Sequence, residues 1–326
     1  MATGKVVVLT RGTFMDKDAM DMFKSVTPVG WKPVFVDMNE GDQKVIDELK
    51  DAEYLLAHGG AVSVKMVENA RKLKLIQSQG QDTGHLPVKW ALDKGIFVAN
   101  AGGANAIAVS EFTVLLMMNC LKKFTQFNRN ISQGKFRGDF DRKGSRELFG
   151  KTVGIVGFGN IGRRVAFLCH AFGASIIYYE RMFVPYALRA DSQAKPVSLD
   201  ELLSASDIVS IHVPSFTANR AMIGWEQLNK MKPTAILINT SRGANIDEKA
   251  LARALNEKKI AVAGIDVWDP EPPDPNNPLL HMSNVVATPH VAGLSYENMA
   301  PGFDTEWRNV VLVSEGKEPM NRIREF

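Results

Sequence analysis

The chain has 326 residues, of which 45% are hydrophobic and 23% are charged, and these are ordinary values for a globular protein. Its formal net charge of +3 at pH 7 is too small to indicate binding to nucleic acid or to a membrane surface. At roughly 150 residues per domain, the length predicts two domains with adequate cores.

The cysteines and the N-terminus favour a cytoplasmic protein. Cys120 and Cys169 both lie in apolar helical stretches, so they resemble small core residues and imply no disulfide. The N-terminus runs directly into a strand pattern without a visible secretory signal. The most apolar segment, residues 104–121, is interrupted by Glu111 and two asparagines, which argues against a membrane span.

Strand-like and helix-like stretches alternate from residue 5 to residue 100, which is typical of a parallel sheet with helices on both faces. This part contains no glycine-rich phosphate motif, so we predict a smaller, flavodoxin-like domain whose loops at 58–61 and 79–84 contact a ligand. The stretch after residue 294 is too short to fold alone. We therefore assign residues 1–100 and 295–326 to one discontinuous, substrate-binding domain.

Residues 101–294 predict a Rossmann-type α/β domain that begins with a long helix over 104–124. An apolar strand near residue 155 ends directly in the pattern G-x-G-x-x-G, and a helix follows it. The first glycine makes a tight turn, the second lets the main chain approach a pyrophosphate, and the third lets the helix pack on the strand. The free N–H groups of the helix N-terminus then face the phosphates. The motif residues are Gly157, Phe158, Gly159, Asn160, Ile161 and Gly162.

Glu180 follows the last glycine of the motif by roughly 20 residues, where an acid can hold the ribose hydroxyls of adenosine. A carboxylate there repels the 2′-phosphate of NADP, so we predict NAD as the cofactor. The neighbouring Arg181 would soften this preference. Further strands predicted at 208–213, 235–239, 262–267 and 285–287 complete a six-stranded, doubly wound parallel sheet.

Polar residues follow the last three of these strands, and the ends of parallel strands meet at one edge of a sheet. Arg242 stands shortly after residue 239, where its guanidinium could hold a substrate carboxylate through two hydrogen bonds. His290 follows the last strand and Glu271 follows the strand before it. The two side chains could therefore act as a proton donor and the carboxylate that orients it.

Four motifs in register resemble the NAD-dependent D-isomer specific 2-hydroxyacid dehydrogenase family, and the resemblance covers nearly the whole chain. They read GIVGFGNIGRRVA, NTSRGANID, AGIDVWDPEPP and NVVATPHVAG. The resemblance implies that Arg242, Glu271 and His290 are the catalytic residues and that Asp266 holds the carboxamide of the nicotinamide. It also implies cofactor contacts from His212, Pro214 and Thr240.

The reaction implied by the resemblance moves a hydride between NAD(H) and a small D-2-hydroxy acid or 2-keto acid. In reduction, protonated His290 would supply the proton that keeps the carbonyl oxygen from becoming an alkoxide. Glu271 would favour the charged imidazolium, and Arg242 would fix the carboxylate and polarise the carbonyl. In the reverse direction neutral His290 is the base.

The loop at 79–85 departs from the family pattern, because Asp82 replaces a glycine and Gly84 stands where an aspartate is usual. Asp82 either turns to the main chain near Pro87 or accepts a hydrogen bond from a hydroxyl or amine of the substrate. Neither this loop nor residues 58–64 contain Lys or Arg, so we expect an unphosphorylated polar acid such as hydroxypyruvate or glyoxylate. The predicted substrate contacts are His58, Gly59, Gly80, Gln81, Asp82 and Arg242.

Two other functions remain open from the sequence. A corepressor-like regulator of the same fold would keep the cofactor site but bind a partner peptide. Formate dehydrogenase is disfavoured, because Glu271 occupies a position where that enzyme is expected to carry glutamine.

The helix predicted over 104–121 carries more apolar residues than one buried face uses, counting Phe112, Leu116, Met117 and Met118. We therefore expect a homodimer built around this helix, and a helix buried within its own domain is the alternative. We expect no metal site and no nucleic-acid or membrane partner.

Overall fold

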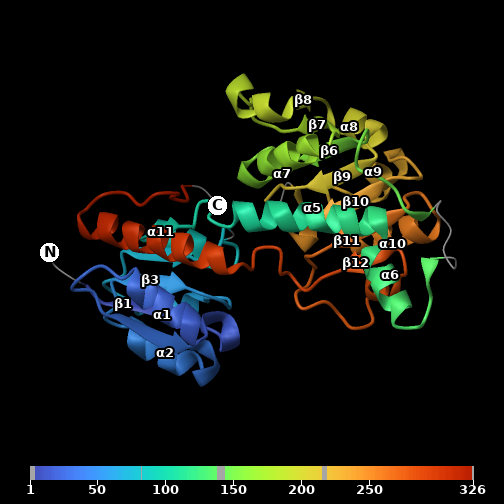
Figure 1. Cartoon of the computed structure of the whole chain (residues 1–326). Coiled ribbons are helices and arrows are strands. Elements are labelled where there is room, and N and C mark those ends of the chain that lie inside the picture. The colour runs from blue at the N-terminus through green and yellow to red at the C-terminus, as the bar shows by residue number, and fades with distance from the viewer. Residues whose placement is uncertain (1–3, 82, 138–143, 215–218, 325–326) are drawn as a thin grey trace. The chain divides into compact units, whose positions relative to one another are not determined.

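The computed structural model describes residues 4–81, 83–137, 144–214 and 219–324. The chain divides into two compact units, and Figure 1 shows their elements coloured from the N-terminus to the C-terminus. Unit 1 comprises Met1–Asn105 and Ser295–Phe326, and unit 2 comprises Ala106–Leu294. The first boundary between the units therefore falls after residue 105. The sequence analysis placed this boundary after residue 100.

The strands of unit 1 form one parallel sheet in the order β2-β1-β3-β4-β5, which is the predicted doubly wound, flavodoxin-like arrangement. The side chains of β1 alternate between two cores, with Val7 and Leu9 in one and Val6 and Val8 in the other. Helices therefore have to cover both faces of this sheet. The strands are β1 (Val6–Thr10), β2 (Pro33–Asp37), β3 (Tyr54–Ala57), β4 (Leu75–Ser78) and β5 (Phe97–Ala99).

Two sets of helices cover the faces of the unit 1 sheet. Side chains of α2 (Asp42–Leu49), α3 (Val64–Val67) and α4 (Val88–Asp93) pack in the core on one face. Side chains of α1 (Lys17–Ser25) and α11 (Tyr296–Ser314) pack in the core on the other. Two short 3-10 helices, η1 (Gly12–Met15) and η2 (Met38–Glu40), follow β1 and β2.

Helix α11 brings the C-terminal part of the chain into unit 1. Ser295 caps its start by accepting a hydrogen bond from the main-chain N–H of Asn298 at 3.2 Å. Phe303, Trp307 and Val310 lie on its buried face and join the core formed with β1. Unit 1 therefore needs residues from both ends of the chain to close its core.

The sheet of unit 2 has seven strands in the order β12-β11-β10-β9-β6-β7-β8, which is the strand order of dinucleotide-binding domains extended by β12. The predicted Rossmann fold is confirmed, but the predicted count of six strands is wrong. The strand that was missed is β8 (Lys195–Pro196), which has only two exposed residues and hence no apolar pattern. The others are β6 (Thr152–Val156), β7 (Ser175–Tyr179), β9 (Ile208–Ile211), β10 (Ile236–Asn239), β11 (Val262–Ile265) and β12 (Val285–Ala287).

Helices also cover both faces of the unit 2 sheet. Side chains of α5 (Ala106–Lys122) and α7 (Asn160–Ala171) pack in one core, and those of α8 (Leu199–Ala205), α9 (Trp225–Lys230) and α10 (Glu248–Asn256) pack in the other. None of the helices in the described part of the chain is both long enough and apolar enough to cross a bilayer. The remaining helical segments are α6 (Phe124–Ile131), η5 (Tyr186–Leu188), η6 (Ala190–Ser192), η8 (Gly243–Asn245) and η9 (Pro278–His281).

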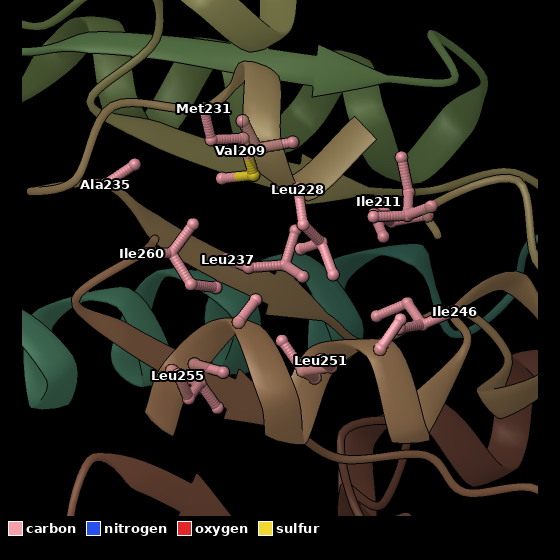
Figure 2. Packing of buried hydrophobic residues seen from close by; sticks show 14 of the residues in the cluster. Val209, Ile211, Leu228, Met231, Ala235, Leu237, Ile246, Leu251, Leu255 and Ile260 are labelled. Atoms are coloured by element: carbon pink, nitrogen blue, oxygen red, sulfur yellow. The ribbon is translucent and has the colours of Figure 1, made fainter. Parts of the chain in front are cut away.

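The core on the α10 face holds the end of β10 in place. Figure 2 shows Leu237 of β10 pointing toward Leu251 and Leu255 of α10, with Val209 of β9 nearby. Asp247 starts α10 by accepting hydrogen bonds from the main-chain N–H groups two and three residues later. Both ends of the segment between β10 and α10 are therefore anchored.

Helix α5 is largely buried within unit 2, so fewer of its apolar residues are left for a dimer interface than the sequence suggested. Leu116 and Met117, which the sequence analysis counted as surplus apolar residues, are 2% and 0% exposed within unit 2. The helix approaches the sheet so closely that a Cβ added to Gly264 would lie 2.8 Å from Leu116 Cγ. Counting these two residues toward a dimer surface was therefore wrong, because the sheet of unit 2 already covers them.

Candidate functional site

The glycine motif of unit 2 forms the turn between β6 and α7. Gly157 has a φ of +93°, and a Cβ there would lie 2.8 Å from the main chain of His212. A Cβ at Gly162 would lie 2.1 Å from the carbonyl oxygen of Gly157. Only glycine therefore permits the close approach of the helix to the strand.

The start of α7 fits the pyrophosphate of a dinucleotide. Gly159 is its N-cap and supplies no side-chain cap, and a Cβ built there would meet no atom within 4 Å. No side chain of Gly159 therefore narrows the approach to the helix N-terminus, which carries the positive end of the helix dipole. Asn160 and Ile161 form the first turn, where Asn160 Oδ1 accepts a hydrogen bond from Arg163 at 2.7 Å. These residues could hold the phosphates of NAD.

Glu180, just after β7, is fixed beside the glycine turn. Its carboxylate accepts hydrogen bonds from the main-chain N–H groups of Phe158 and Arg181, both at 2.8 Å. The Arg181 guanidinium donates to Asn219 Oδ1 at 2.7 Å, and Asn219 in turn donates to the carbonyl oxygen of Pro214 at 2.8 Å. The acid thus lies where the ribose of a dinucleotide on this turn would need it.

His212 follows β9 and cannot act as a charged group. Its Nε2 lies 2.8 Å from the hydroxyl of Ser210, and desolvation by burial lowers the pKa of His212 to about 3. Its main-chain N–H donates to the carbonyl oxygen of Val156 at 2.7 Å. The imidazole is therefore neutral near pH 7, and its main chain is tied to the strand that carries the glycine motif.

The turn that carries Arg242 is built around Asn239, the last residue of β10. Asn239 Oδ1 accepts from the N–H and the hydroxyl of Ser241 at 3.1 and 2.7 Å, and its Nδ2 donates to the carbonyl oxygen of Arg242 at 2.9 Å. A Cβ at Gly243 would lie 2.0 Å from the main chain of Trp268. The turn after β10 therefore packs directly on the segment after β11.

Glu271 and His290 form a hydrogen-bonded pair in unit 2. His290 Nδ1 lies 2.7 Å from Glu271 Oε2, and the other carboxylate oxygen accepts from the main-chain N–H of Trp268 at 3.0 Å. The His290 side chain is 43% exposed. Because Nδ1 is engaged with Glu271, proton exchange with another molecule falls to Nε2.

The charge of Glu271 is set by opposing effects. Partial burial alone would raise the pKa of Glu271, but the hydrogen bonds from His290 and Trp268 and the positive charge of Arg242 outweigh it and lower the pKa below its usual value. Glu271 is thus ionised near pH 7. A depressed folded-state pKa means that the pair stabilises the fold above the ordinary glutamate pKa, and this stabilisation is lost as the pH falls through the lowered value.

Asp266 holds the loop that carries His290. Its side chain is 0% exposed and accepts from the hydroxyl of Thr288 at 2.6 Å and from the N–H groups of Val291 and Ala292 at 3.0 and 2.9 Å. Its carbonyl oxygen also accepts from the N–H of His290 at 2.7 Å. Asp266 therefore positions this loop, and its expected contact with the nicotinamide stays a prediction.

The hydroxyl of Thr240 is likewise engaged within unit 2. It lies 2.8 Å from the hydroxyl of Thr113 on α5, and Thr240 is 6% exposed. Any contact of this residue with a cofactor would therefore come from its main chain. In the described part of the chain, no group of three or more His, Cys, Asp or Glu side chains is arranged to hold a metal ion.

His58, at the end of β3, lies in the interior of unit 1 and not on its surface. Its ring is 0% exposed, with Nε2 2.8 Å from Glu306 Oε2 on α11 and Nδ1 3.3 Å from the sulfur of Met15. The ring also stacks on Phe303. The expected contact of this side chain with substrate is therefore corrected, because α11 covers it.

The other predicted substrate residues of unit 1 lie in turns after β3 and β4. Gly59 has a φ of +87°. The carbonyl oxygens of Gly80 and Gln81 accept from the N–H of Ala101 at 3.1 Å and from the Asn100 side chain at 2.9 Å. Asp82 lies outside the described residues.

The sequence analysis missed a cation at this edge of unit 1. Arg11 follows β1, and a Cβ added to Gly60 would lie 3.5 Å from Arg11 Cδ. The expectation of an unphosphorylated acid considered only the residues within the loops 58–64 and 79–85, which contain no Lys or Arg, and the structure brings Arg11 to the first of these loops from a third segment. The order of the strands could have revealed it, because β1 and β3 are neighbours in a doubly wound sheet of this kind.

Comparison with known proteins agrees with this geometry. Residues 114–292 match the family model described as D-isomer specific 2-hydroxyacid dehydrogenase, NAD binding domain. The chain is 34% identical to a glyoxylate reductase of Korarchaeum cryptofilum over 289 residues, which cover 86% of this chain and 85% of that protein. It is 38% identical over 277 residues to a D-3-phosphoglycerate dehydrogenase of Methanocaldococcus jannaschii; these cover 83% of this chain but only 51% of that relative.

A solved structure with the same fold is a D-lactate dehydrogenase with NAD+ from Lactobacillus jensenii. It superposes with a TM-score of 0.80 at 25% sequence identity, over 98% of this chain and 100% of that chain. Both sheets of the chain thus have counterparts in a protein with a bound dinucleotide.

Replacing Asp266 with asparagine tests the positioning role. In Asp266→Asn the amide would direct its NH2 group at a main-chain N–H, so we expect the free energy of unfolding of unit 2 to fall by about 1–3 kcal/mol. Urea denaturation measures this loss. The exposed Asp191 provides a control, since Asp191→Asn should change stability by less than about 0.5 kcal/mol. Equal stability losses in the two variants would contradict the role.

Proposed function

Since the chain belongs to the D-isomer specific 2-hydroxyacid dehydrogenase family of NAD-dependent oxidoreductases, we propose that it interconverts a small polar D-2-hydroxy acid and its 2-keto acid. The observation that carries the proposal is the Glu271–His290 pair, with Arg242 close enough to lower the pKa of Glu271. The glycine turn of the same unit fits the dinucleotide.

The roles of the residues follow from charge. Bound NADH supplies the hydride for reduction of the keto group. Protonated His290 donates a proton from Nε2 to the carbonyl oxygen, so that no alkoxide has to form. Glu271 accepts from Nδ1, which fixes the ring and stabilises its positive charge. Arg242 binds the substrate carboxylate and polarises the carbonyl group.

We propose hydroxypyruvate and glyoxylate as substrates of this kind. The similarity to a glyoxylate reductase over most of both chains supports a short 2-keto acid. The main chain at Gly59, Gly80 and Gln81 would supply hydrogen bonds to it. Oxidation of NADH with a panel of keto acids tests the proposal, and a corepressor-like regulator would turn over none of them.

The first prediction concerns the proton donor. His290→Ala should lower kcat for keto-acid reduction by about 100- to 10,000-fold, because the proton source is lost.

In Glu271→Gln the imidazolium loses its carboxylate partner, so the pH at which the reduction rate falls to half should move downward. Steady-state rates across pH 5–9 measure this shift. A Glu271→Gln profile that overlays the wild-type profile would argue against the pair.

A further prediction concerns cofactor choice. Because the Glu180 carboxylate would repel a 2′-phosphate, kcat/KM for NADH should exceed that for NADPH by about 10- to 100-fold. Glu180→Ser should narrow this ratio, whereas the control Glu147→Ser changes an exposed acid elsewhere in unit 2 and should leave it unchanged. A wild-type kcat/KM for NADPH equal to that for NADH would refute the role of Glu180.

We also propose a cytoplasmic homodimer. Apolar side chains of α5, α6 and the segment after α6 remain exposed in unit 2 and would be covered by a second copy. These exposed residues are Ile107, Leu115, Phe124, Ile131 and Phe136.

Sedimentation tests the dimer. The wild type should sediment at twice the chain mass of 35.9 kDa, and Leu115→Glu should sediment as a monomer because it places a charge in the interface. Val29→Glu serves as the control, since Val29 is a fully exposed apolar residue of unit 1. A wild-type monomer at micromolar concentration would exclude the dimer.

A further inference from the structure

Arg11 stands at the point of the unit 1 sheet where ligands are expected. The strand order β2-β1-β3-β4-β5 reverses its direction between β1 and β3. In open parallel sheets, ligands bind outside the carboxyl ends of the strands at such a reversal. Leu9 of β1 lies in register with Ala57 of β3, so Arg11 and Gly59 each lie two positions beyond this pair, past the carboxyl ends of the two strands.

The turn opposite Arg11 consists of two glycines with unusual backbone angles. Gly59 and Gly60 have φ values of +87° and +84°. A Cβ at Gly60 would lie 2.7 Å from the sulfur of Met38 and 3.5 Å from Arg11 Cδ. The side chain of Arg11 therefore packs along this turn, and glycine keeps the turn accessible to the guanidinium.

The hydrogen-bond donors of Arg11 and of the turn at Gly59 and Gly60 are available to a ligand. Among the described residues, no main-chain or side-chain acceptor takes the N–H of Gly59 or Gly60, and no carboxylate forms an ion pair with Arg11. Arg11 is also the only lysine or arginine in the described segments that follow the five strands, which are 11–16, 38–41, 58–63, 79–81, 83–87 and 100–105.

We propose that Arg11, with the main-chain N–H groups of Gly59 and Gly60, forms a subsite for a second anionic group of the substrate. A guanidinium presents paired N–H donors that match a carboxylate or phosphate, and successive N–H groups in a turn add to the attraction for an anion. The subsite selects 2-keto acids that end in a carboxylate or phosphate over neutral acids of equal length. This inference rests on the proposed function and narrows its substrate class, because an acid with a second anionic group would be preferred to hydroxypyruvate and glyoxylate, which have none.

The test compares matched substrates that differ in the second charge. Oxaloacetate is paired with 2-oxobutyrate, and 3-phosphohydroxypyruvate with hydroxypyruvate, and kcat/KM is measured with NADH for each. In Arg11→Gln the ratio of charged to neutral substrate should fall by about 10- to 100-fold in at least one pair. The pair that responds identifies the second anion as carboxylate or phosphate. In Arg11→Lys, which keeps the charge but loses the paired donors, this ratio should fall less.

The control is an arginine of the same unit on the other edge of the sheet. Arg71 is exposed and precedes the amino end of β4, whereas Arg11 follows the carboxyl end of β1. Arg71→Gln should therefore keep both wild-type ratios. Ratios in Arg11→Gln that stay within twofold of wild type in both pairs would overturn the subsite.

A binding measurement separates this inference from the proposed function. Calorimetry with NAD+ present gives Kd for D-malate against D-2-hydroxybutyrate and for 3-phospho-D-glycerate against D-glycerate. If the wild type oxidises NADH with none of the keto acids, the proposed function fails. The Kd ratios in Arg11→Gln then decide the subsite, because a ratio that falls supports it and ratios like those of the wild type overturn it.

Discussion

The candidate site depends on one buried carboxylate, that of Asp266 at the end of β11. A polar side chain with no exposure is stable only when hydrogen bonds replace its water, and three donors from the segment after β12 do so for Asp266. The same bonds fix the main chain around His290. Glu271 then lies 2.7 Å from the ring, so the geometry of the proposed proton donor depends on Asp266.

Both units use the same property of parallel sheets. Carboxyl ends of neighbouring strands lie at one edge, so short polar segments that are far apart in the sequence come together there. In unit 2 the segments after β10 and β11 pack closely at this edge, because Gly243 lies against the main chain of Trp268. In unit 1 Gly60 keeps the turn after β3 narrow enough for Arg11 to lie along it.

Charge is distributed unevenly between these edges. Unit 2 has a guanidinium, Arg242, beside the hydrogen-bonded Glu271–His290 pair, and this combination suits a keto acid that must receive a proton. At this edge of the unit 1 sheet the described segments contain one guanidinium, that of Arg11, which has no ion-pair partner among the described residues, and this suits recognition of an anion without chemistry. Specificity and catalysis would then depend on separate residues, so the substrate range could change without loss of the proton donor.

The sequence by itself determined the features that depend on short stretches: the alternation of strands and helices, the glycine turn with Glu180, and the strand ends that carry Arg242, Glu271 and His290. These follow from local periodicity and from residue types with one structural use. Only the tertiary structure decided the burial of His58, whose partner Glu306 is 248 positions away, and the packing of Arg11 against Gly60. Such contacts depend on the order of strands and the return of α11, which no local pattern specifies.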